Sequence, residues 1–172
     1  GPTSTESSQY YMGIQRYIDY FNSNRTIAGK QVNLIVRDSE YNPDLAEAHY
    51  NEIMAEYNPI AILGWGTGAT LNLAPAVTED EIPFMSASYD QSLNDPENKP
   101  YNFLIGVTYA DQMRIVLKYI LQEYGEQLDT LKIAFFHHDS SFGRSPLPAG
   151  REFCQENGLN IVAEVPDSSE LS

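Results

Sequence analysis

Residues 60–70 read Ile-Ala-Ile-Leu-Gly-Trp-Gly-Thr-Gly-Ala-Thr, an apolar run that passes into glycines and hydroxyl-bearing residues. Short apolar runs that end at glycine are typical of buried strands. The residues that follow, as far as Glu79, have the apolar spacing of a helix. We therefore expect a strand over 59–63, a glycine-rich turn, and a helix over 69–79.

The same alternation of two periodicities extends in both directions along the chain. Apolar residues three and four apart predict helices, and short β-branched runs predict strands. Helices are expected over residues 7–22, 43–57, 69–79, 111–124 and 149–157, and strands over 32–37, 59–63, 83–86, 103–107, 131–136 and 159–165. Strands that alternate with helices imply crossover connections, and hence an α/β fold with mostly parallel sheets covered on both faces.

Composition limits the class of function. The chain has 172 residues, of which 42% are hydrophobic, so it can build a core. Its net charge of −14 would repel nucleic acids and anionic lipids, and we expect no nucleic-acid partner. The single cysteine excludes an intrachain disulfide and a multi-cysteine metal site. No stretch reaches the roughly 18 apolar residues of a membrane span.

The glycine-rich turn is open to three interpretations. Backbone N–H groups at a helix start can bind an anion, either a carboxylate or a phosphate. Gly64-x-Gly66-x-x-Ala69 also matches a dinucleotide fingerprint, with Asp90 placed as the ribose-binding acid, which would indicate an NAD(P)-type enzyme. The third interpretation is a tight turn that binds nothing. We favour the anion site, because this turn follows the second predicted strand, whereas the fingerprint normally opens its domain.

Other candidate residues lie at predicted strand ends. Trp65 is interpreted as a core side chain or as the wall of a pocket, and the glycines on either side of it favour the wall. Phe142 either lines the mouth of a cleft or covers the sheet edge. His137 and His138 point to opposite faces of a strand, so we expect one to be packed and one solvated rather than both to bind a metal.

The order of these features resembles the type I periplasmic solute-binding proteins of ABC importers, in the leucine/isoleucine/valine-binding branch. The matching motifs run along the whole chain. They are Gly1-Pro2 with Gly13, Gly29-Lys30 before Arg37-Asp38, Asn42-Pro43, Ile62-Leu63-Gly64 with its Thr/Gly loop, Ala74-Pro75 before Glu79-Asp80-Glu81-Ile82-Pro83, and Phe142-Gly143 after His138-Asp139.

This resemblance implies two α/β lobes that close on a small ligand without chemical conversion. It assigns the ligand's carboxylate to the backbone and hydroxyl groups of Thr67, Gly68, Ala69 and Thr70, with Ser88 or Tyr89 assisting. Trp65 is expected beside them, and Phe142 is expected to pack on the ligand from the second lobe. No enzymatic activity, cofactor or metal is implied.

The resemblance also implies an organisation and a location. Residues 1–105 are expected to form the amino-terminal lobe without its first strand, and residues 106–172 the beginning of the second lobe, so the sequence is expected to be an incomplete fragment. The expected partners are a small carboxylate-bearing solute, either an amino acid or an aromatic acid, and a membrane permease. The expected location is periplasmic or extracytoplasmic, with or without a lipid anchor. A receptor ectodomain of the same fold, which senses a ligand, is the alternative.

Overall fold

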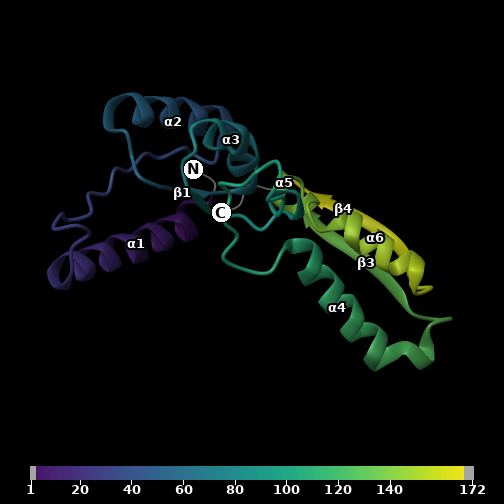
Figure 1. The fold of residues 1–172 in the computed structure, drawn as a ribbon. Helices are drawn as coiled ribbons and strands as arrows, with labels where there is room; N and C mark the ends of the chain where they lie inside the picture. The colour runs from purple at the N-terminus through teal and green to yellow at the C-terminus, as the bar shows by residue number, and fades with distance from the viewer. Residues whose placement is uncertain (1–2, 169–172) are drawn as a thin grey trace. The chain divides into compact units, whose positions relative to one another are not determined.

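The computed structural model describes residues 3–168 and contains helices and parallel strands, which alternate from β1 onward (Figure 1). Gly1-Pro2, the first motif of the resemblance, lies outside the described residues. The chain divides into two compact units, the first reaching Pro59 and the second starting at Ile60.

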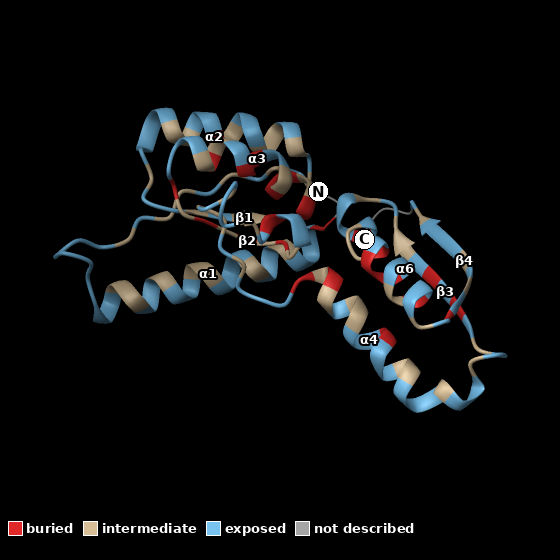
Figure 2. Cartoon of the chain, turned by 45° about the vertical axis from the view of Figure 1, so that its right-hand side comes forward, coloured by how far each residue is buried: buried red, intermediate tan, exposed pale blue. Residues whose placement is uncertain are grey.

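The first unit contains two helices, α1 (Ser4–Asn24) and α2 (Pro43–Tyr57). The helix α2 begins as its sequence predicts, because the side chain of Asn42 accepts hydrogen bonds from the backbone N–H groups of Asp44 and Leu45. No residue of α1 is buried, and Figure 2 shows its surface as exposed or intermediate along its length.

The strand expected over residues 32–37 does not form, and this prediction is wrong. A strand is stable only when a neighbouring strand satisfies its backbone groups. In the described part of this unit, no strand lies beside the segment. The backbone N–H and carbonyl of Val32 are instead bonded to the side chain of Asn22, each at 2.8 Å.

The second unit contains two pairs of parallel strands. Strand β1 (Ile62–Trp65) pairs with β2 (Phe84–Ala87), and helix α3 (Thr67–Glu79) connects them. Strand β3 (Lys132–His138) pairs with β4 (Asn160–Asp167), with a bulge between Ile133 and Ala134. The helices after β3 are α5 (Ser141–Arg144) and α6 (Leu147–Glu156).

The segment between the two pairs is irregular at its start and helical at its end. A short 3-10 helix, η1 (Gln91–Leu93), follows β2, and α4 (Tyr109–Tyr124) and a second 3-10 turn, η2 (Gly125–Gln127), precede β3. The strand expected over 103–107 is reduced to a single parallel bridge between Asn102 and Phe84. Residues 103–107 themselves carry no helix or strand.

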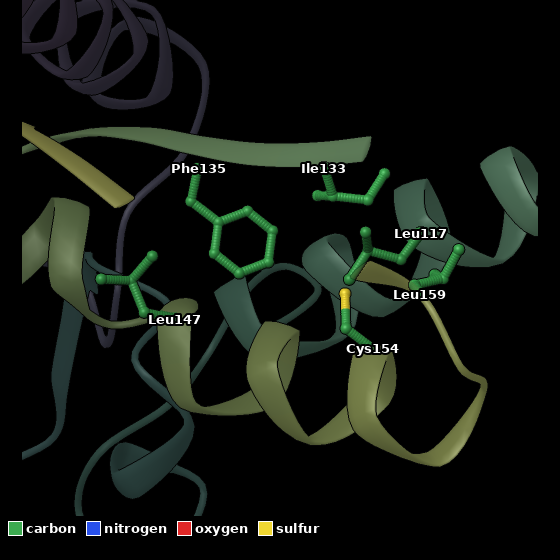
Figure 3. Close-up of a cluster of buried hydrophobic side chains, with 6 residues drawn as sticks. All are labelled: Leu117, Ile133, Phe135, Leu147, Cys154 and Leu159. Carbon is green, nitrogen blue, oxygen red and sulfur yellow. The ribbon is translucent and has the colours of Figure 1, made fainter. Parts of the chain in front are cut away.

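Apolar side chains from α4, α6, one face of β3 and the residue just before β4 form a hydrophobic core. Figure 3 shows them pointing toward one another: Leu117, Ile133, Phe135, Leu147, Cys154 and Leu159. On the other strand pair, Gly64 permits β1 to approach β2, because a Cβ at this position would lie 2.6 Å from the ring of Phe84. Strand β1 therefore ends close against β2, and α3 begins directly beyond it.

Candidate functional site

The strand, turn and helix follow one another as the sequence predicts, but the turn is shorter than expected: β1 includes Gly64 and Trp65, α3 already includes Thr67 and Gly68, and Gly66 alone links them. Gly66 has a φ of 89°, a conformation that favours glycine, and it occupies the N-cap position of α3. Glycine has no side chain with which to cap a helix, and the structure shows no side-chain cap bond here. The N–H groups of Thr67, Gly68 and Ala69 thus start a helix whose positive dipole end lacks a polar cap.

Two pairs of hydroxyl groups connect α3 to β2 and to the residue after it. Thr70 Oγ1 donates to the carbonyl oxygen of Gly66 at 2.7 Å and lies 2.5 Å from Ser86 Oγ. Because the single hydroxyl hydrogen of Thr70 goes to Gly66, Ser86 is the donor in the second bond. The hydroxyl hydrogen of Thr70 is therefore already used inside the protein.

Among the described residues, the second hydroxyl pair leaves one hydroxyl hydrogen available for a further hydrogen bond. Ser88 Oγ donates to Thr67 Oγ1 at 3.0 Å, and both side chains are buried, at 0% and 1% exposed. Thr67 accepts this hydrogen bond, so its own hydroxyl hydrogen can be given to another acceptor. In the described residues, this leaves Thr67 as a hydroxyl donor beside the N–H groups of the first turn of α3.

Aromatic rings gather from three separate segments. Tyr89, after β2, contacts the ring of Tyr109 edge-on, with ring centroids 5.7 Å apart. Tyr109 in turn contacts Phe142 of α5 edge-on at 5.2 Å. The helix α5 also contacts α3. Phe142 keeps 42% of its surface exposed, so it can still pack against another apolar group.

Gly143 fixes where Phe142 lies. A Cβ on Gly143 would be 2.1 Å from the carbonyl oxygen of His138 and 2.7 Å from its backbone nitrogen. Only glycine therefore allows α5 to pack this closely on the end of β3. The side chain of Ser140 caps the helix at its start by accepting from the N–H of Gly143.

Asp90, which the dinucleotide interpretation assigns to a ribose, has its carboxylate bonded to protein groups. One oxygen accepts from the backbone N–H and the hydroxyl of Ser92, and the other accepts from the hydroxyl of Ser145 at 2.6 Å. Burial raises the pKa of Asp90, but the hydrogen bonds from Ser145 and Ser92 outweigh that effect and leave the pKa below its ordinary value.

The structure therefore brings most of the expected residues into two neighbouring groups. One is a cluster of hydroxyl-bearing residues, Thr67, Thr70 and Ser88. The other is a cluster of aromatic residues that includes Tyr89 and Phe142. Trp65 ends β1 and stands in register with Ala87, and it is half-buried. Sequence reasoning missed Tyr109, which connects Tyr89 to Phe142.

No cluster of three or more metal-binding side chains occurs among residues 3–168. His137 Nδ1 lies 3.0 Å from the backbone carbonyl oxygen of His138, and both histidines are half-buried. In the same part of the chain, no helix combines the length and hydrophobicity needed to cross a membrane.

A family model described as "Periplasmic binding protein" matches residues 1–170 of the chain. The chain belongs to the periplasmic binding protein family. The resemblance seen in the sequence, to the type I periplasmic proteins of the branched-chain amino acid branch, is thereby confirmed, as is the α/β fold with parallel strands.

Two solved structures of ABC transporter proteins are similar to this chain in both fold and sequence. A branched-chain amino acid ABC transporter protein from Thermus thermophilus with bound valine is 32% identical, with a TM-score of 0.89 over 97% of this chain and 43% of that one. An ABC transporter substrate-binding protein from Aeropyrum pernix is 34% identical, with a TM-score of 0.84 over 96% of this chain and 43% of that one.

A more distant member of the family supports the fold alone. It is a solute-binding protein of an ABC transporter from Rhodopseudomonas palustris in complex with 3,4-dihydroxybenzoic acid, 24% identical, with a TM-score of 0.79 over 96% of this chain and 44% of that one. The chain thus spans less than half the length of these periplasmic binding proteins. No curated protein matches it significantly.

Proposed function

We propose that the protein is the solute-binding component of an ABC importer, working outside the cytoplasm with a membrane permease. It captures a small carboxylate-bearing solute and releases it chemically unchanged. Family membership supports the class of function, and the residues around Gly66 support the class of solute.

The observation that carries the proposal is the set of unused donors at the start of α3. Thr67 has a hydroxyl hydrogen to give, and the N–H groups of the first turn have no side-chain cap. Hydrogen-bond donors at the positive end of a helix favour a negatively charged group. We therefore assign the carboxylate to Thr67, Gly68 and Ala69, with Ser88 holding Thr67 in place and Thr70 holding the loop.

The aromatic rings support an apolar or aromatic tail on the solute. Tyr89, Tyr109 and Phe142 form a continuous series of ring contacts, and Phe142 is partly exposed. Valine, which is bound in the similar structure from Thermus thermophilus, carries both a carboxylate and an apolar portion. Trp65 is proposed as a further wall of the same site.

Capture is proposed to proceed by closure of two lobes. Residues 1–105 would belong to the first lobe and residues 106–172 to the second, with bending near Gly106. Residues 103–107 support this division, because they form no helix or strand and because Phe103, Ile105 and Val107 are exposed.

The proposal is tested by a thermal-shift screen of the full-length gene product against amino acids, aromatic acids and NAD(H). A bound acid should raise the unfolding temperature progressively with its concentration, since it stabilises only the native state. Stabilisation by NAD(H) and by no acid would contradict the proposal and favour the dinucleotide interpretation.

Variants of Thr67 then test the site. Thr67→Val removes the donor, and a hydrogen bond to a charged group is worth about 1.5–3 kcal/mol, so we expect affinity to fall roughly 10- to 150-fold. Thr67→Ser keeps the donor and should retain affinity. Thr70→Val, whose hydroxyl bonds only protein groups, should lower stability with a smaller effect on affinity. Equal losses for Thr67→Val and Thr70→Val would refute the assignment of the carboxylate to Thr67.

A further inference from the structure

Asp90 and Ser145 form a side-chain hydrogen bond between segments that are 55 residues apart in the sequence. Asp90 is the N-cap residue of η1, just after β2, and Ser145 follows directly after α5. The Ser145 hydroxyl donates to one carboxylate oxygen of Asp90 at 2.6 Å, and both residues are half-buried. This bond joins the part of the chain that carries β1 and β2 to the part that carries β3 and β4.

Besides the contact of α5 with α3, the same two parts meet close to the connection between them. The backbone carbonyl of Tyr89 accepts from the N–H of Tyr109 at 2.8 Å, and the side-chain oxygens of Thr108 and Gln91 lie 3.0 Å apart. Both of these contacts lie at the start of α4, directly after the irregular residues 103–107. They can therefore persist when the connection bends. The contact of Ser145 with Asp90 lies 38 residues further along the chain than Val107, beyond β3, and bending would separate it.

We propose that Asp90 and Ser145 form a latch whose hydrogen bond exists only when the two lobes are closed, and that this bond raises the affinity for the solute. The inference rests on the proposed function, because a latch matters only if capture requires closure. Asp90 is a positioning residue in this account: it holds α5, which carries Phe142 and contacts α3.

The chemistry of the pair suits this role. A carboxylate that accepts a hydroxyl hydrogen bond at 2.6 Å makes a stronger bond than two neutral groups do. The ordinary pKa of an aspartate carboxyl is 3.8, and the hydrogen bonds from Ser145 and Ser92 lower it further against the raising effect of burial, so the acceptor is ionised at neutral pH. When the lobes separate, water replaces Ser145, so the latch biases the equilibrium toward closure only modestly and remains reversible.

Ser92 provides a matched control. Its hydroxyl also donates to the Asp90 carboxylate at 2.6 Å, but it lies two residues away on the same segment and links nothing across the connection. Ser145→Ala should weaken binding of the best acid in the screen, L-valine and 3,4-dihydroxybenzoate included, by roughly tenfold. Ser92→Ala should weaken it by less than about threefold, and Asp90→Asn should resemble Ser145→Ala. Equal effects of Ser145→Ala and Ser92→Ala would overturn the latch.

A readout that needs no solute separates this inference from the proposed function. Fluorescent labels on Glu79→Cys and Gln155→Cys, both exposed positions, report the distance between α3 and α6 in the ligand-free protein, while the native Cys154 is buried. Ser145→Ala should lower the closed fraction and Ser92→Ala should not. If wild type binds no acid but this difference is found, the latch stands and the proposed solute is wrong. If acids bind and neither affinity nor distance responds to Ser145→Ala, the latch is wrong and the function stands.

Discussion

Replacing Gly143 by alanine should displace α5 from the end of β3. The added Cβ would lie 2.1 Å from the carbonyl oxygen of His138 and 2.7 Å from its nitrogen, distances that no real Cβ contact shows. Both are backbone atoms of a paired strand, so they cannot move aside as a flexible side chain would.

The size of the effect follows from two opposing terms. Overfilling a packed site costs about 1–3 kcal/mol, and backbone neighbours place this one at the upper end. Alanine is more favourable than glycine within a helix by up to about 1 kcal/mol, which offsets part of that cost. We therefore expect the free energy of unfolding to fall by about 2 kcal/mol.

Urea unfolding followed by the fluorescence of Trp65 measures this change. With a slope of about 1–3 kcal/mol per molar urea, the midpoint should move down by roughly 1 M. Affinity for the solute should fall as well, because Phe142 is the neighbour of Gly143 and moves with α5.

Gly125→Ala is the matched control for the loss of a glycine. Gly125 has a φ of −60°, and the nearest atom to its added Cβ is Leu121 Cδ1 at 3.9 Å, an ordinary contact. This change should raise stability by about 0.4–1 kcal/mol through the unfolded state. If both variants unfolded at the same urea concentration, the close approach of Gly143 to His138 would contribute nothing to the free energy of unfolding.

Three further changes test the fold. Leu117→Ala, at a position 1% exposed in the core between α4 and β3, should lower the free energy of unfolding by about 2–5 kcal/mol in urea titrations. Asn42→Ala should lower it by about 1 kcal/mol, since two N–H groups of α2 lose their acceptor, whereas Asn42→Asp should preserve it. The hydrogen bond from Arg151 lowers the pKa of Glu164 from its ordinary 4.5. The stability that this pair contributes is therefore present above pH 4.5 and is lost as the pH falls through the lowered pKa of Glu164. Glu164→Gln should therefore flatten the acid limb of the midpoint-against-pH curve, and an unchanged limb would show that the pair contributes nothing.

Local signals in the sequence were sufficient to predict most helices. The pair Asn42-Pro43 predicts the start of α2 because a cap acts within one turn of chain. The start of α4 was misplaced at Asp111. The N-cap is Thr108, whose hydroxyl accepts from the N–H of Asp111 and donates to its carboxylate. A hydroxyl residue three positions before an acid is a recognisable capping signal.

Features that depend on distant partners could not be predicted in the same way. Residues 32–37 are as apolar and β-branched as those of β1. A strand also needs a partner strand to hydrogen-bond with, and the sequence of the segment itself does not show whether one is present. The contact between Asp90 and Ser145 is equally nonlocal, and only the fold reveals it. The glycine-rich turn, by contrast, was recognised because strand, turn and helix are contiguous.

The two hydroxyl pairs have a consequence for how the protein responds to a solute. Thr67 and Thr70 lie about one turn apart on α3, and their partners Ser88 and Ser86 lie two residues apart along one strand direction, so the pairs fasten the helix to the sheet at two points. Both pairs oppose rotation and sliding of α3, so the donors of its first turn are oriented in the absence of a ligand. If these donors bind a solute as proposed, little conformational entropy is lost at this helix on binding.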